Sequence, residues 1–286
     1  DLTLTQNAQP ALMATSIAAL RALEAEGFGL DQAGFVAGHS LGEYSALCAA
    51  GSFSLSDTAR LLRIRGQAMQ EAVPVGIGAM AALLGLDYET ATAVATEAAQ
   101  GEVCQAANDN DPAQVVVSGH RAAVERAVDI ARARGARRAI LLPVSAPFHC
   151  ALMQPAAQAM AEALATVALR APAVPLVANV RAEAVTDPAT IRALLVEQVT
   201  GAVRWRESVG WMAAQGVTVN VVSPAATETA MLQDPARAAS QPRLPPIGRL
   251  IRPQEIAELV AFLLSPSAAA ITGQDVAICG GASLAR

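Results

Sequence analysis

An apolar run that ends in a G-x-S-x-G pentapeptide constrains this chain more than any other feature. The run covers residues 34–37, the pentapeptide covers residues 38–42, and an alanine-rich helical pattern follows. This order predicts a strand, a sharp turn and a helix, with Ser40 on strained backbone between two glycines. Ser40 is therefore the candidate nucleophile, and the backbone N–H of Leu41 at the helix N-terminus could stabilise an oxyanion. The structural alternative is a glycine-flanked serine that caps a helix.

The composition is that of a globular chain with an acidic balance. Of the 286 residues, 53% are hydrophobic, and the formal net charge is −5. These values allow a substantial core and argue against nucleic acid or an anionic membrane as the main partner. The four cysteines show neither metal nor disulfide spacing, so we expect a cytoplasmic location, and no apolar run has the length of a membrane span. Because the chain begins at Asp1 without an initiator methionine, we expect that it starts inside a longer protein.

Periodicity and breaker residues predict an α/β chain. Helices are expected at 10–26, 41–50, 54–72, 155–167, 188–200, 205–215 and 254–264, and strands at 34–38, 174–179, 217–222 and 271–279. Residues 78–143 have a pattern of their own, with strands at 79–84, 102–107, 114–118 and 137–143 and helices at 88–99 and 120–134. That βαββαβ order is the ferredoxin-like split motif, which predicts a small subdomain inserted into an α/β-hydrolase-like core.

A serine nucleophile needs a base, and the chain has three histidines. His39 adjoins Ser40 and should point to the opposite side of the strand, which makes it a poor base. His120 lies at the start of a helix, where a capping or exposed role is expected. His149, in the loop that returns from the subdomain, is the best base by elimination, and its alternative is an ordinary loop histidine. No acidic residue stands out, so we expect a backbone or amide carbonyl to orient it.

Arg65 has two interpretations. It lies in the second helix after the pentapeptide, where an arginine is most often a solvated surface charge. The same position could let it clamp a carboxylate with two parallel hydrogen bonds. Position alone does not decide between them.

Five stretches together resemble the malonyl-CoA:acyl-carrier-protein transacylase family. They are residues 38–47 (GHSLGEYSAL), 65–72 (RGQAMQEA), 78–82 (GAMAA), 114–119 (QVVVSG) and 147–153 (PFHCALM). They occur in the family's order, and the resemblance covers about residues 2–217. It implies a ping-pong transfer of malonyl from coenzyme A to the phosphopantetheine thiol of acyl carrier protein in fatty acid biosynthesis, without a further cofactor or metal.

The resemblance also implies roles for individual residues. Ser40 would carry the malonyl ester, and His149 would act as general base and then as general acid. Arg65 would pair with the malonyl carboxylate, and Gln9 resembles a glutamine that lines the family's active site. Two residues of the pentapeptide complete the substrate-binding set, which is Arg65, Gln9, Leu41 and His39.

The chain departs from the family pattern at both ends. The family begins with a strand and a G-Q-G-S-Q loop whose glutamine N–H helps to form the oxyanion hole, and that segment would precede Asp1. The family ends with a strand, an acidic V-G-P-G turn and a helix, where a side-chain amide carbonyl steers the histidine. The missing oxyanion loop implies reduced or lost activity.

In place of that ending, residues 216–231, 248–257 and 271–281 resemble the last strands and the substrate-loop helix of short-chain dehydrogenases/reductases. The resemblance, to the 3-oxoacyl-[acyl-carrier-protein] reductase type, covers about residues 216–284 and implies a short Rossmann-type fragment. Thr229 matches a threonine that touches the nicotinamide end of the cofactor. The glycine-rich loop and the Y-x-x-x-K pair are missing, so hydride transfer by this chain alone is not expected.

The two resemblances predict three parts. Residues 1–77 and 144–217 would form a large acyltransferase subdomain, 78–143 the small subdomain, and 218–286 the reductase-like fragment, whose first strand could still join the transacylase sheet. Two functions compete with malonyl transfer. One is an NADP-dependent reductase fragment that acts only with a complete partner, and the other is a non-catalytic chimera.

Overall fold

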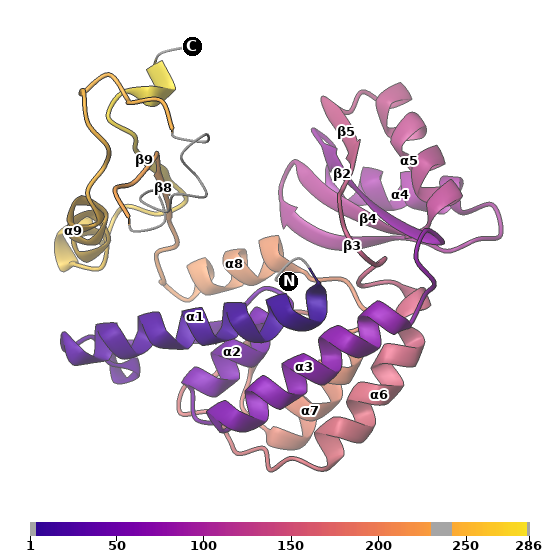
Figure 1. The fold of residues 1–286 in the computed structure, drawn as a ribbon, viewed down its shortest axis with the longest axis horizontal. Coiled ribbons are helices and arrows are strands. Elements are labelled where there is room, and N and C mark those ends of the chain that lie inside the picture. The colour runs from indigo at the N-terminus through magenta and orange to yellow at the C-terminus, as the bar shows by residue number, and fades with distance from the viewer. Residues whose placement is uncertain (1–3, 230–241, 285–286) are drawn as a thin grey trace. The chain divides into compact units, whose positions relative to one another are not determined.

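The computed structural model describes residues 4–229 and 242–284 (Figure 1). The chain falls into two compact units, Asp1–Trp211 and Met212–Arg286. The boundary between them lies within helix α8 (Trp205–Ala214). Both units contain helices and strands, so the prediction of a mixed α/β fold is confirmed.

The central sheet of the first unit has three strands in the order β1-β6-β7. β1 (Val36–Ala37) pairs in parallel with β6 (Leu176–Ala178), and β6 pairs antiparallel with β7 (Glu183–Val185). β1 and β6 lie inside the ranges expected from the sequence. β7 was not expected, because only Val185 of its three residues is buried and the segment has no apolar pattern.

Five helices share one hydrophobic core with this sheet. They are α1 (Thr5–Ala25), α2 (Gly42–Ala49), α3 (Leu55–Glu71), α6 (Gln154–Ala165) and α7 (Pro188–Glu197), with single 3-10 turns at Leu30–Gln32 and Ala151–Met153. The expectation that Pro10 begins the first helix is wrong, because α1 starts at Thr5 and contains Pro10. α1 lies very close to α3, since a Cβ atom added at Gly66 would be 2.5 Å from the Cα atom of Gln6. This close approach brings the side chain of Gln9 to α3.

The small sheet of the first unit has four antiparallel strands in the order β3-β4-β2-β5. The strands are β2 (Gly78–Leu84), β3 (Cys104–Asp111), β4 (Gln114–His120) and β5 (Arg138–Leu141). Two helices, α4 (Tyr88–Ala99) and α5 (Arg121–Ala133), pack against each other and against the sheet (Figure 1). Small buried residues on both helices, such as Ala91, Ala95 and Ala127, allow this close packing. The elements therefore follow the expected order along the chain.

β3 is longer than the sequence pattern predicts, because its second half is polar. Within it, Asn108 and Asp109 are buried. The backbone of Val203 pairs with this part of β3, donating to Ala107 O and accepting from Asp109 N–H, both at 2.9 Å. The carboxylate of Asp109 also forms a salt bridge with Arg206 of α8 at 2.8 Å. These contacts compensate the polar groups and fix the small sheet to the rest of the first unit.

The second unit contains a parallel pair of strands, β8 (Val221–Pro224) and β9 (Asp275–Ile278), with helix α9 (Pro253–Leu263) between them in the sequence. The idea that residues 217–222 add to the transacylase sheet is wrong. Among the described residues, β8 pairs with β9 alone, and residues 217–220 are not a strand. Part of the predicted proline-rich loop, including Pro235, and the end of the stretch 216–231 lie outside the described residues.

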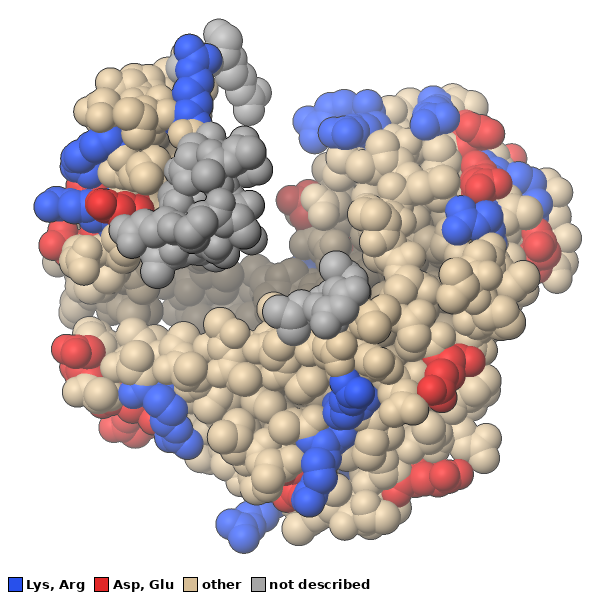
Figure 2. Space-filling model, in the orientation of Figure 1, with Lys and Arg blue, Asp and Glu red and all other residues tan. Residues whose placement is uncertain are grey.

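The described helices include none that combines the length and the apolar character that a bilayer crossing requires. On the face shown in Figure 2, acidic and basic side chains of the first unit are interspersed. This face therefore lacks the extended positive field that would attract nucleic acid.

We expect Arg206→Ala to lower the free energy of unfolding by about 2–3 kcal/mol, because it leaves the fully buried carboxylate of Asp109 without its cation. This loss in the free energy of unfolding is smaller than is usual for breaking a buried ion pair, because the Arg206 side chain is 37% exposed and its charge is partly screened. Urea denaturation measures the change. Arg21→Ala, which breaks an exposed pair with Glu24, is the control and should leave the free energy of unfolding nearly unchanged. Equal losses in the two variants would contradict a stabilising role for the Asp109–Arg206 pair.

Candidate active site

Ser40 lies at a sharp turn between β1 and α2, on backbone in the left-handed region with φ of 54°. Gly38 makes the turn possible, because a Cβ atom there would be 2.0 Å from the backbone of Gly42. The buried side chain of Asn179, directly after β6, holds the turn from the other side. Its Oδ1 accepts from the N–H of Ser40 at 2.7 Å, and its Nδ2 donates to the carbonyl of Gly38 at 2.8 Å.

His149 contacts Ser40 directly. Its Nε2 lies 2.7 Å from Ser40 Oγ, and its Nδ1 lies 2.9 Å from the backbone carbonyl of Gln198. Because a carbonyl can only accept, Nδ1 carries the proton and Nε2 is left as the acceptor facing the hydroxyl. Burial, assisted by the charge of Arg65, lowers the pKa of His149 to about 3. The imidazole is therefore neutral and able to take the proton of Ser40 at physiological pH.

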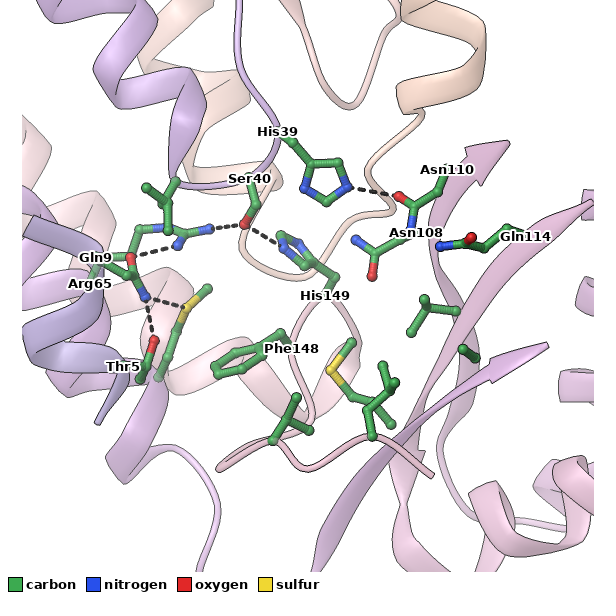
Figure 3. Close-up of a pocket in the computed structure, with 17 residues that line it drawn as sticks. Thr5, Gln9, His39, Ser40, Arg65, Asn108, Asn110, Gln114, Phe148 and His149 are labelled. Carbon is green, nitrogen blue, oxygen red and sulfur yellow. Dashed lines mark hydrogen bonds between the residues drawn. The ribbon is translucent and has the colours of Figure 1, made fainter. Parts of the chain in front are cut away.

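Arg65 approaches Ser40 from the side opposite His149 (Figure 3). Its side chain is buried, and its NH2 group donates to Ser40 Oγ at 3.1 Å and to Gln198 Oε1 at 2.8 Å. NH1 donates to Gln9 Oε1 at 2.8 Å, and the guanidinium lies 5.7 Å from the ring centroid of Tyr44. Burial lowers the pKa of Arg65, while Tyr44 and Glu43 raise it. The solvated-surface interpretation of Arg65 is thus wrong.

These side chains line a pocket of about 380 Å³. Helices and loops around the central sheet form one wall, and the small sheet forms the other with Asn108, Asn110 and Gln114 (Figure 3). Leu41, which is the N-cap residue of α2, also lines the pocket. Among the described residues, the Leu41 N–H has no hydrogen-bond acceptor. A donor at this position is suited to an oxyanion that forms beside Ser40.

All six candidate residues from the sequence line this one pocket: Gln9, His39, Ser40, Leu41, Arg65 and His149. The expectation that His39 points away from Ser40 is wrong. The positive φ of Ser40 breaks the alternation of a strand, so both residues face the pocket, where His39 Nε2 bonds to Asn110 Oδ1 at 2.8 Å. His120 lies outside the pocket. It occupies the N-cap position of α5 but accepts from the N–H of Val103 rather than capping the helix.

Sequence reasoning missed Gln198 and Asn179. The expectation that a backbone or amide carbonyl orients His149 is confirmed, but the sequence did not identify the residue, which is Gln198, directly after α7. Asn179 lies at the end of a buried strand, and this was a usable signal, because polar residues at strand ends often face a site. Gln198 had no such signal, since its backbone makes the contact with His149.

The geometry allows one kind of chemistry plainly. A serine hydroxyl bonded to a neutral imidazole, beside a free backbone N–H and a buried cation, can accept an acyl group as an ester and release it again. Within residues 4–229 and 242–284, no cluster of three or more His, Cys, Asp or Glu residues could hold a metal ion. The chain is an acyltransferase with a mixed α/β fold.

Comparisons with known proteins specify the class. The family model of the acyl transferase domain matches residues 1–276, and the chain belongs to this family. The malonyl CoA-acyl carrier protein transacylase of Escherichia coli is 49% identical over 217 residues, which is 76% of this chain and 70% of the relative. The acyl-carrier-protein-S-malonyltransferase of Bartonella henselae has a TM-score of 0.77 and 52% identity, covering 92% of this chain and 82% of that one. A malonyl-transacylase in complex with a type II PKS acyl-carrier protein has a TM-score of 0.74 and 44% identity, covering 77% and 71%.

We expect the reactivity of Ser40 toward a serine-directed organophosphorus reagent to stay constant within about twofold between about pH 5 and pH 8. The reason is that His149, with a pKa of about 3, remains a neutral base throughout that range. Labelling rates followed by intact-protein mass spectrometry measure this. Ser40→Ala is the control and should not be labelled. A labelling rate that falls about tenfold per pH unit below pH 6.5 would contradict this prediction, because it would indicate a histidine with an unshifted pKa.

Proposed function

We propose that this chain transfers malonyl from malonyl-CoA to the phosphopantetheine thiol of acyl carrier protein, through an ester on Ser40, in fatty acid biosynthesis. The hydrogen bond of 3.1 Å between Arg65 and Ser40 Oγ is the observation that supports this most. A buried guanidinium beside the nucleophile suits an acyl group that ends in a carboxylate, because the two form charge-assisted hydrogen bonds. The names of the relatives and the similar complex with an acyl-carrier protein support the same donor and partner.

In the first half-reaction, Ser40 Oγ attacks the thioester carbonyl while its proton passes to His149 Nε2. The Leu41 N–H stabilises the oxyanion of the tetrahedral intermediate, and one such donor is worth about 10²–10³ in rate. Collapse of the intermediate breaks the C–S bond. His149 returns its proton to the sulfur of coenzyme A, which leaves as a thiol and yields the malonyl ester of Ser40.

The second half-reaction reverses these steps. His149 takes the proton of the phosphopantetheine thiol, the thiolate attacks the ester, and Ser40 regains its proton from His149 as it leaves. The acyl group moves between two sulfurs without a change in oxidation state. We therefore propose that no cofactor is needed beyond the two thioester substrates.

Substrate positioning in this proposal depends on Arg65. The malonyl carboxylate would bond to the guanidinium, and Gln9 and Gln198 would keep the guanidinium in place through their side-chain oxygens, each 2.8 Å away. Asn110 and Gln114, on the opposite wall of the pocket, and His39 are proposed to contact the thioester arm.

The architecture supports a finer description of the fold. The strand order β3-β4-β2-β5, with both helices between strands of one antiparallel sheet, is that of the ferredoxin-like motif. We propose this motif for residues 78–143 and an α/β-hydrolase-like core for 1–77 and 144–217.

Four cysteines with free thiols support the proposal of a cytoplasmic location.

For residues 218–286 we propose a Rossmann-type fragment of the reductase kind that lacks a cofactor site. The parallel pairing of β8 with β9, with α9 between them in the sequence, supports a β-α-β origin. The acyl transferase match, which runs to residue 276, includes most of the same segment and favours the competing origin. We expect no binding heat when NADPH is titrated into the protein in a calorimeter. A saturable heat would instead support the reductase alternative.

The proposed function is tested by incubating the protein with radiolabelled malonyl-CoA and measuring label that survives denaturation. We expect label on the wild type and none on Ser40→Ala, because the ester forms at that hydroxyl. Adding phosphopantetheinylated acyl carrier protein should then move the label to the carrier. An unlabelled wild type, or equal label on Ser40→Ala, would overturn the proposal.

The same assay tests the carboxylate clamp. Arg65→Ala should lower kcat/KM for malonyl-CoA by about 10²–10³, since it removes a buried charged partner worth several kcal/mol, and should spare acetyl-CoA. Arg63→Ala, an exposed position on the same helix, is the matched control. Unchanged selectivity between malonyl and acetyl groups in Arg65→Ala would count against the clamp.

A further inference from the structure

Glu43 is a buried carboxyl group that the mechanism above does not use. It lies in the first turn of α2, three residues after Ser40, and is 1% exposed. Its Oε2 accepts a hydrogen bond from Gln198 Nε2, and its Oε1 has no hydrogen-bond partner among the described residues. Among the described residues, no cation is bonded to it directly. A carboxyl group is seldom buried in this way without a partner of opposite charge, so its position calls for an explanation.

Gln198 connects Glu43 to the groups that react. Besides bonding Glu43, its Nε2 donates to the backbone carbonyl of Ser40 at 3.0 Å. Its Oε1 accepts from Arg65 at 2.8 Å, and its backbone carbonyl accepts from His149 Nδ1 at 2.9 Å. A side-chain amide rotated by 180° would present its NH₂ group to Arg65 and its oxygen to Glu43, which repels both. Glu43 and Arg65 together therefore fix the amide in one orientation.

We propose that Glu43 is a positioning residue that holds the Gln198 amide between Arg65 and Ser40, and that its carboxyl group takes up a proton from solvent when a substrate carboxylate binds at Arg65. The second half of this inference rests on the proposed function, because it requires an acyl group that ends in a carboxylate.

The charges around Glu43 explain the proton uptake. Arg65 and Tyr44 are the charged and titratable groups that act on it, while Gln198 and Asn179 are neutral. Burial raises the pKa of Glu43 to about 7, although Gln198, Asn179 and Arg65 each oppose the rise. Burial also raises the pKa of Tyr44 far above neutrality, so Tyr44 stays uncharged. Near neutral pH, Glu43 is thus partly ionised and provides the only nearby negative charge that opposes the cation of Arg65 within the described residues.

A bound malonyl carboxylate changes this balance. Two negative charges would then face one guanidinium in a water-poor site, and the repulsion raises the pKa of Glu43 further. Below pH 7 the carboxyl group of Glu43 is already mostly protonated, so binding of malonyl-CoA requires no further proton uptake there. Above pH 7 each binding event requires proton uptake, and the affinity for malonyl-CoA falls as the pH rises.

The kinetic test compares wild type with Glu43→Gln, which keeps a similar shape but cannot ionise. For the wild type we expect KM for malonyl-CoA to rise about threefold to tenfold from about pH 7 to pH 8.5, since linkage allows up to tenfold per pH unit. Glu43→Gln should have a KM that does not depend on pH over this interval. Glu89→Gln, an exposed position in the first turn of α4, is the matched control and should keep the wild-type profile. A purely structural role for Glu43 would change KM and kcat without removing the pH dependence, and that result would overturn the inference.

A second measurement needs no substrate. Because the folded-state pKa of Glu43 is raised above its usual value of 4.5, the stability it provides is fully present below about pH 4.5 and is lost as the pH rises through 7. The melting temperature of the wild type relative to Glu43→Gln should therefore fall between about pH 5 and pH 7 and then remain level. A constant difference would overturn the inference. If malonyl-CoA fails to label the wild type, the proposed function fails alone, and the melting curves still decide whether Glu43 ionises as described.

Discussion

A positive charge buried without a bonded carboxylate organises this acyltransferase. Arg65 is 1% exposed, and its described hydrogen-bond partners are neutral oxygens from Gln9, Gln198 and Ser40. Burying a guanidinium is costly, and the cost is tolerated only when each N–H is well satisfied or a countercharge is near. The Nε atom of Arg65 has no hydrogen-bond partner among the described residues. The site is thus electrostatically prepared for an incoming anion, and α1, α3 and the residue after α7 are held together by the same group.

The small sheet gives the site its second wall. The polar half of β3 is the contact point, because buried Asp109 pairs with Arg206 and the neighbouring Asn108 and Asn110 face the pocket. Gln105 on the same strand accepts from the N–H of Ala151 at 2.7 Å and so touches the loop that bears His149. The strand that lines the pocket is therefore also the one that fixes the small sheet to α8 and to the loops of the first unit. The residues that line this wall of the pocket are thus neighbours of those that anchor the small sheet.

Several features of the fold and site could be predicted from the sequence, and the reasons are local. The turn at Ser40 is encoded within five residues, and α4 and α5 follow from their periodic alanines. Arg65 and Gln9 were identified only through a resemblance, since a helix arginine has no local property that distinguishes a clamp from a surface charge. Gln198 was missed because its contact with His149 is made by the backbone, which any residue possesses. The predicted strand ended before the end of β3, because the buried polar side chains of β3 are compensated by Arg206 and Val203, about a hundred residues away in the chain.

The two residues that exchange a proton share one unusual backbone property. Ser40 and His149 have φ angles of 54° and 57°, in a region where a side chain costs of order 1–3 kcal/mol and glycine costs nothing. Glycine at either position would relax the chain and abolish the chemistry. Selection for heat resistance alone would therefore favour inactive descendants, so retention of both side chains in an evolving lineage would record continued demand for the reaction.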